Sequence, residues 1–95
     1  MEARPTARII TAGPGIMGVY PEIGFGIDEA LAKSLQLAYS AGEFAARPLR
    51  KAPRRIVVEL SDGSIIVAWR KGDHVVGVYV EPSKPLLRAQ QAPLP

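Results

Sequence analysis

Between residues 56 and 80 the chain alternates β-rich apolar runs with two short polar turns, and this is its clearest pattern. The stretch reads IVVEL, SDGS, IIVAWR, KGD and HVVGVYV. Asp62-Gly63 is a strong signal for a two-residue hairpin, because a type I′ turn requires positive φ at both central positions. Gly72-Asp73 marks a second turn. The pattern therefore predicts a three-stranded meander.

The two turns also predict which side chains share a face of this meander, because side chains alternate along a strand. The first turn sets Leu60 opposite Ile65, and the second sets Trp69 opposite Val76. One predicted face is apolar throughout and consists of Ile56, Val58, Leu60, Ile65, Val67, Trp69, Val76, Val78 and Val80. The other face is mixed and smaller, and consists of Val57, Glu59, Ile66, Ala68, Arg70, Val75, Gly77 and Tyr79.

Two shorter apolar runs, at residues 8–11 and 16–20, are separated by an Ala-Gly-Pro-Gly turn and predict a hairpin. Gly13, Gly15 and Gly18 also match the G-x-G-x-x-G pattern of dinucleotide sites. Such a site requires a helix to begin at these glycines. A β-branched residue, an aromatic residue and a proline follow instead. We interpret the motif as a glycine-rich hairpin turn.

Residues 29–46 predict the one long helix, with Asp28 as its N-cap and Pro48 ending it. Leucine and alanine recur at helical spacing and give the helix an apolar stripe, which Leu37 and Phe44 are expected to widen. Its small residues would allow a close approach by the protein's own sheet or by a second helix across a dimer. These small residues are Ser34, Ala38, Ala41, Gly42 and Ala45.

The predicted order is β-β-α-β-β-β, an α+β fold with a five-stranded antiparallel sheet and one main helix on one face. We expect residues 1–82 to form a single domain. Residues 83–95 are proline-rich, and we expect a mostly flexible tail, with a proline-rich docking peptide as the alternative. A core built from 95 residues is marginal, which favours association with another chain.

Candidate catalytic chemistry is sparse in this sequence. The absence of cysteine excludes disulfides and thiolate sites. His74, the one histidine, follows Asp73, but Ser61 and Ser64 lie at the far end of the meander, so no triad is evident. The carboxylates are scattered and give neither a metal cluster nor an acid/base pair. We therefore expect no enzyme activity, no metal and no cofactor.

The remaining composition bears on location. No apolar run approaches the ~20 residues of a membrane span. The N-terminus lacks the apolar segment of a signal peptide, and we expect a cytoplasmic protein. The chain has no asparagine and its turns are rich in proline and glycine, which hints at a thermophilic source.

A basic run without acidic neighbours follows the helix and consists of Arg47, Arg50, Lys51, Arg54 and Arg55. Such a run can neutralise phosphates of nucleic acid or meet an acidic partner. Alternatively it is a solvated loop whose charges suit the C-terminus of the helix. No aromatic residue interleaves with it, so the sequence does not support a base-stacking platform.

The first strand of the meander, residues 56–60, pairs on one side with residues 65–70 and has no predicted neighbour on the other. It contains no proline or lysine to guard that edge. An unguarded apolar edge predicts pairing with another chain. Antiparallel pairing with a symmetry mate would also bring two copies of the helix together.

Residues 28–80 contain the stretches DEALAKSLQLAYSAGEF, RRIVVELSDGSIIVAW and VVGVYV. Through these stretches the chain resembles the Roadblock/LC7 domain family. The resemblance implies a small homo- or heterodimeric protein that regulates or scaffolds Ras-like small GTPases or serves as a dynein light chain. It also implies that strand 56–60 pairs with its dimer mate.

The family usually has a helix before its first strand and often another after its last strand. We expect neither helix here, because few residues precede the first predicted strand and the tail is rich in proline. One sheet face would then be partly bare, and we expect another subunit to cover it. On the preceding assignment of faces, that face carries Val57, Ile66, Ala68, Val75 and Tyr79.

Our first hypothesis is therefore a non-enzymatic dimeric Roadblock/LC7-like module that binds a small GTPase or a related partner. The expected dimer interface consists of Leu31, Ser34, Leu35, Ala38, Ala41, Gly42, Ile56, Val57, Val58, Glu59 and Leu60. The expected partner surface consists of Arg47, Arg50, Lys51, Arg54, Ile66 and Tyr79. The alternatives are a basic nucleic-acid-binding protein that uses residues 47–55 and a small enzyme that uses the glycine-rich turn.

Overall fold

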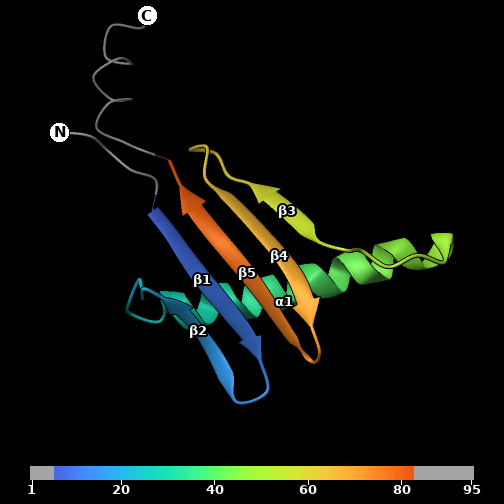
Figure 1. The fold of residues 1–95 in the computed structure, drawn as a ribbon, viewed down its shortest axis with the longest axis horizontal. Helices are drawn as coiled ribbons and strands as arrows, with labels where there is room; N and C mark the ends of the chain where they lie inside the picture. The colour runs from blue at the N-terminus through green and yellow to red at the C-terminus, as the bar shows by residue number, and fades with distance from the viewer. Residues whose placement is uncertain (1–5, 83–95) are drawn as a thin grey trace, which may run out of the picture.

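The computed structural model describes residues 6–82, which form a five-stranded antiparallel sheet with one long helix behind it (Figure 1). The elements in chain order are β1 (Thr6–Gly13), β2 (Ile16–Tyr20), α1 (Ile27–Ala46), the 3-10 helix η1 (Arg47–Leu49), β3 (Ile56–Glu59), β4 (Ile65–Lys71) and β5 (His74–Glu81). The sheet order is β2-β1-β5-β4-β3. The predicted α+β class and element order are confirmed. The predicted tail, residues 83–95, lies outside the described residues.

The first hairpin turns at Pro14-Gly15, where Gly13 lies opposite Ile16. Gly15 has a φ of 80°, the left-handed conformation that glycine adopts at the third position of a type II turn after proline. The glycine motif is therefore a hairpin turn, as interpreted from the sequence. β1 begins at Thr6, earlier than predicted, because it pairs with β5 from Thr6 onward.

The helix begins at Ile27, two residues earlier than predicted, and its N-cap is Gly26 rather than Asp28. Asp28 has a different role at this end of the helix. Its Oδ1 atom accepts hydrogen bonds from the backbone N–H groups of Ile23 and Gly24, at 2.8 and 2.9 Å. The carboxylate thus fixes the loop before the helix, and its negative charge also suits the helix dipole.

The turn between β3 and β4 is one residue longer than predicted. Ile56 lies opposite Ala68, one position out of the predicted register. The N–H group of Leu60 donates to the Ser64 carbonyl oxygen at 2.8 Å, and Gly63 adopts a φ of 92° at the end of a three-residue loop. A slip of one residue moves every β3 side chain to the other face of the sheet.

The helix covers the mixed face of the meander, whereas the sequence analysis predicted that this face would be partly bare. The buried core consists of Ile10, Ala12, Val19, Ala32, Leu35, Tyr39, Ile66, Ala68 and Val75. Small residues at the centre of this face let the helix approach closely. A Cβ atom added to Gly77 would lie 2.7 Å from Leu35 Cδ2.

The predicted assignment of the two faces is therefore corrected in two ways. Across β4 and β5, the residues predicted as the apolar face lie on the face that α1 leaves uncovered, namely Ile65, Val67, Trp69, Val76, Val78 and Val80. On β3, the slip in register turns Ile56 and Val58 toward the helix, where they pack against the core. Val57, predicted for the mixed face, lies on the uncovered face with Val67.

Candidate functional site

The outer edge of β3 is the first candidate surface. Among residues 6–82 no strand pairs with this side of β3, so the predicted free edge is confirmed, although the strand ends at Glu59 and Leu60 begins the turn. Leu60 and Ser64 form a hydrogen-bonded pair. Such pairs alternate along an antiparallel ladder, so the peptide groups of Val57 and Glu59 point outward.

One flank of α1 faces this edge. A Cβ atom added to Gly42 would lie 3.3 Å from Ile56 Cγ2, which places the Gly42 side of the helix toward β3. Residues at helical spacing along this flank are Ser34, Ala38, Ala41 and Ala45. The helix crosses behind the sheet from β2 and continues past β4 (Figure 1). The free edge and the small-residue flank therefore lie on the same side of the molecule.

Two leucines of the predicted dimer interface belong instead to the protein's own packing. Leu35 is 3% exposed and lies in the core, and Leu31 packs against it partly buried. Neither is available to a second chain to the extent expected. The exposed large apolar side chains of α1 are Ile27, Leu37 and Phe44. The prediction that Leu37 and Phe44 widen the apolar stripe is therefore wrong, because both side chains point away from the sheet. Their position out of phase with the buried stripe is the signal that identifies them.

A hydrogen-bonded network holds the segment that leads into β3. The Tyr39 hydroxyl donates to the Pro53 carbonyl oxygen at 3.0 Å. Arg70 lies over the Tyr39 ring and donates two hydrogen bonds of 2.9 Å to Glu43. The hydrogen bond from Arg70 lowers the pKa of the Glu43 carboxyl below its ordinary value. Glu43 lies on the side of α1 away from the small-residue flank, and Tyr39 lies on its buried side. The contacts of these two residues therefore fix the position of the free edge.

The uncovered face of the sheet, which we call the open face, is a second candidate surface. Its register places Val57, Val67, Val78, Ile9 and Tyr20 in one row across all five strands. Val57, Ile9 and Tyr20 are more than half exposed. Contiguous exposed apolar side chains of this kind mark interaction surfaces on folded proteins. Ile66 and Tyr79, predicted to receive a partner on the bare face, lie on the covered face instead.

The basic run is divided between two places. Arg47, Arg50 and Lys51 are exposed around η1, at the end of α1 that projects beyond the sheet (Figure 1). Arg54 and Arg55 line a shallow pocket of about 420 Å³ on the sheet. The two groups therefore cannot be treated as one continuous site.

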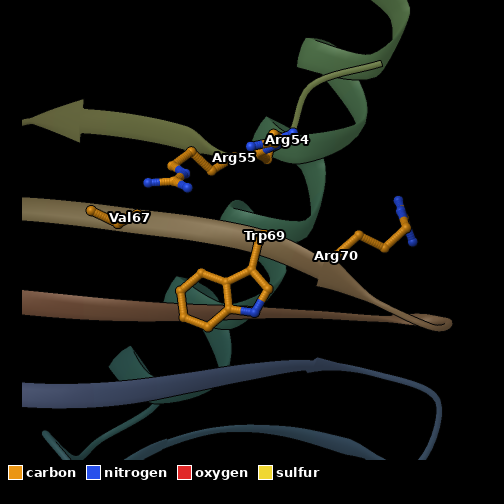
Figure 2. Close-up of a pocket in the computed structure, with 5 residues that line it drawn as sticks. All are labelled: Arg54, Arg55, Val67, Trp69 and Arg70. Carbon is orange, nitrogen blue, oxygen red and sulfur yellow. The ribbon is translucent and has the colours of Figure 1, made fainter.

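The pocket also contains the chain's one tryptophan. Figure 2 shows the Trp69 indole lying broad side over the sheet, with Arg55 beside it above Val67 and Arg70 directed away. Trp69 is 36% exposed. Within residues 6–82 neither Arg54 nor Arg55 makes a hydrogen bond or ion pair. The fold thus brings an aromatic surface to the basic run, which the linear sequence did not indicate.

Among residues 6–82, the remaining polar groups do not form a catalytic constellation. His74 Nδ1 lies 2.8 Å from Asp73 Oδ1, but Ser61 and Ser64 belong to the turn at the opposite end of β4 (Figure 1). The Tyr79 hydroxyl donates to Glu81 Oε2, and burial raises the pKa of this phenol. In the described part of the chain, no three His, Cys, Asp or Glu side chains gather as a metal site.

No protein-family model matches the chain. No curated protein matches it at a significant level. No helix within residues 6–82 is both long and apolar enough to cross a membrane.

Proposed function

We propose that the protein is a non-enzymatic dimeric interaction module of the Roadblock/LC7 type, which regulates or scaffolds a small Ras-like GTPase or a related partner complex. The free β3 edge beside the small-residue flank of α1 is the observation that carries this proposal. A two-fold axis next to β3 would join two sheets and bring two helices side by side. The resemblance of residues 28–80 to the family supplies the class of partner.

The open face is the surface that would receive the partner. In the dimer, the apolar row that ends at Val57 would continue into the same row of the second copy. The joined surface would span ten strands and offer a long apolar contact area. Interfaces are recognised by exposed apolar patches of this kind with aromatic residues among them, and Trp69 and Tyr20 supply the aromatic residues here.

Sedimentation of the purified protein over a range of concentrations tests the dimer. We expect the natural sequence to form a dimer and V57K to dissociate at least tenfold more readily, because the two introduced lysines would repel each other across the shared edge. The control is I16K. Ile16 is 49% exposed and Val57 56%, and both lie on edge strands, but Ile16 lies on β2. I16K should remain dimeric, and a natural protein that stays monomeric at high micromolar concentration would refute the proposal.

A nucleic-acid-binding protein is the second candidate, and Trp69 is the observation that favours it. A base stacked on the indole, with its phosphate at Arg54 or Arg55, would use both parts of the pocket. Stacking of one base contributes about 1–3 kcal/mol.

Titration of a single-stranded oligonucleotide at several salt concentrations tests this candidate. W69A should weaken binding about tenfold or more. The double variant R54A/R55A should lower the dependence on salt, by about one unit of slope for each arginine that binds a phosphate. The double variant R50A/K51A is the control, because these residues lie away from Trp69. Equal weakening in the two double variants would show a diffuse charge effect and exclude the pocket.

A further inference from the structure

The outer edge of β3 carries charges of opposite sign at its two ends. Arg55, Val57 and Glu59 alternate along the open face, and Arg55 borders the same pocket as Val67 of that face. Arg55 and Glu59 are exposed, and neither has an ion pair within residues 6–82. The peptide groups of these positions point outward by the alternation described above. The edge therefore presents free hydrogen-bonding groups together with a basic and an acidic end.

Symmetry limits how this edge can pair with a second copy of itself. A two-fold axis perpendicular to the sheet keeps the open face of both copies on the same side. Directly opposed residues in an antiparallel pair point to the same face, so an open-face residue must lie opposite an open-face residue. The axis must then pass through a residue rather than between two. For a strand of this length the axis lies at Ile56, Val57 or Val58.

The three registers differ in which charged residues they set opposite one another. With the axis at Val57, Arg55 lies opposite Glu59 of the second copy, and the symmetry makes this pair twice. With the axis at Val58, Glu59 lies opposite Val57 of the second copy and no opposite charges meet. With the axis at Ile56, Glu59 lies opposite Pro53, which has no N–H group to donate. Over residues 55–59, the Val57 register alone pairs charge with charge and apolar residue with apolar residue.

We infer that the two β3 strands of the proposed dimer pair in the register centred on Val57, which Arg55–Glu59 ion pairs hold at both ends. The inference rests on the proposed dimer and specifies its geometry. On the covered face this register sets Ile56 opposite Val58 of the second copy, so the two cores meet through apolar contacts. Cross-strand pairs of opposite charge stabilise an antiparallel ladder, and like charges destabilise it.

A charge-exchange experiment tests the register. R55E and E59R each place like charges opposite one another at both ends of the edge, and each should dissociate about tenfold more readily than the natural dimer. An equimolar mixture of the two variants should recover the dimer as a heterodimer, because every opposed pair is again of opposite sign. R54E is the control: its charge change is the same, but position 54 lies opposite Leu60 in this register. An equimolar mixture of R54E and E59R should dissociate as readily as the two variants do alone.

The outcomes of this experiment separate the register from the dimer. Recovery in the mixture of R55E and E59R supports the Val57 register. A natural dimer whose mixed variants are no tighter than each variant alone overturns the register and leaves the proposed dimer standing. A natural protein that is monomeric overturns both.

A thiol placed on the proposed axis gives an independent readout. The chain has no cysteine, so V57C introduces a single thiol. In the Val57 register the two Cα atoms at position 57 are about 5.5 Å apart, as in any hydrogen-bonded antiparallel pair, which a disulfide can span. Oxidation should therefore yield a covalent dimer. E59C is the matched control, because its two thiols would be four residues out of register. Efficient crosslinking of E59C but not V57C would contradict the inference.

Discussion

Replacing Leu35 by alanine will lower the free energy of unfolding by about 2–5 kcal/mol. The side chain is 3% exposed and reaches the centre of the sheet at Gly77. Truncation removes buried apolar packing and leaves a cavity between helix and sheet that the surrounding backbone cannot close. Denaturant unfolding measures the change. The loss of stability should be the same at low and high protein concentration, because Leu35 packs within its own chain.

Leu37 provides the matched control for this prediction. It lies two residues further along the same helix and is 71% exposed. L37A should change the unfolding free energy of the isolated chain by less than about 0.5 kcal/mol, as is usual for surface substitutions. Equal effects of L35A and L37A would contradict the observed packing. If L35A lowered the free energy of unfolding only at concentrations where the protein associates, Leu35 would belong to the dimer interface, as the sequence predicted.

Replacing Gly77 by valine will destabilise the fold by about 1–3 kcal/mol through overpacking. An added Cβ would lie 2.7 Å from Leu35 Cδ2 and 3.2 Å from the Val67 carbonyl oxygen. The second of these atoms belongs to the backbone of the neighbouring strand, so a change of rotamer at Leu35 alone cannot relieve the strain. Thermal or denaturant unfolding checks the decrease in stability.

Gly18 is the control for the change at Gly77. It also lies in a strand, but nothing lies within 4 Å of an added Cβ. G18V should be neutral or mildly stabilising, because valine favours extended backbone. The double variant L35A/G77V should be destabilised by less than the sum of the two single variants, since the valine would occupy part of the space that the leucine leaves. Strict additivity would show that the two side chains do not share this space.

The order of elements could be predicted from the sequence because the turn signals are local. Pro14-Gly15 and Gly72-Asp73 each act through a few backbone dihedral angles, and both turns lie where the sequence placed them. The covered face could not be predicted in the same way. The sequence analysis ranked the faces by apolar content, whereas close approach of the helix depends on small residues such as Ala68 and Gly77. The helix therefore covers the face on which it can approach most closely, rather than the face with more apolar residues.

Of the candidate surfaces, the one that depends on local sequence could be predicted, and the one that depends on the tertiary fold could not. The free edge of β3 could be predicted, because it follows from counting neighbours along a meander. The meeting of Trp69 with Arg54 and Arg55 could not be predicted. These residues are fourteen or more positions apart, and they meet only because the link before β3 returns to the sheet beside β4. Similarly, Leu35 lies on the predicted apolar stripe, but the stripe alone did not say whether its partner was a sheet or a second helix.

The extra residue in the loop that ends at Gly63 determines which chemistry β3 offers to the outside. With a loop one residue shorter and β4 unchanged, Arg55, Val57 and Glu59 would face the helix. Ile56 and Val58 would then face solvent. Turn length therefore controls the sidedness of the edge as well as its register. Across variants of this chain, a deletion in that loop should be tolerated less well than a substitution in it.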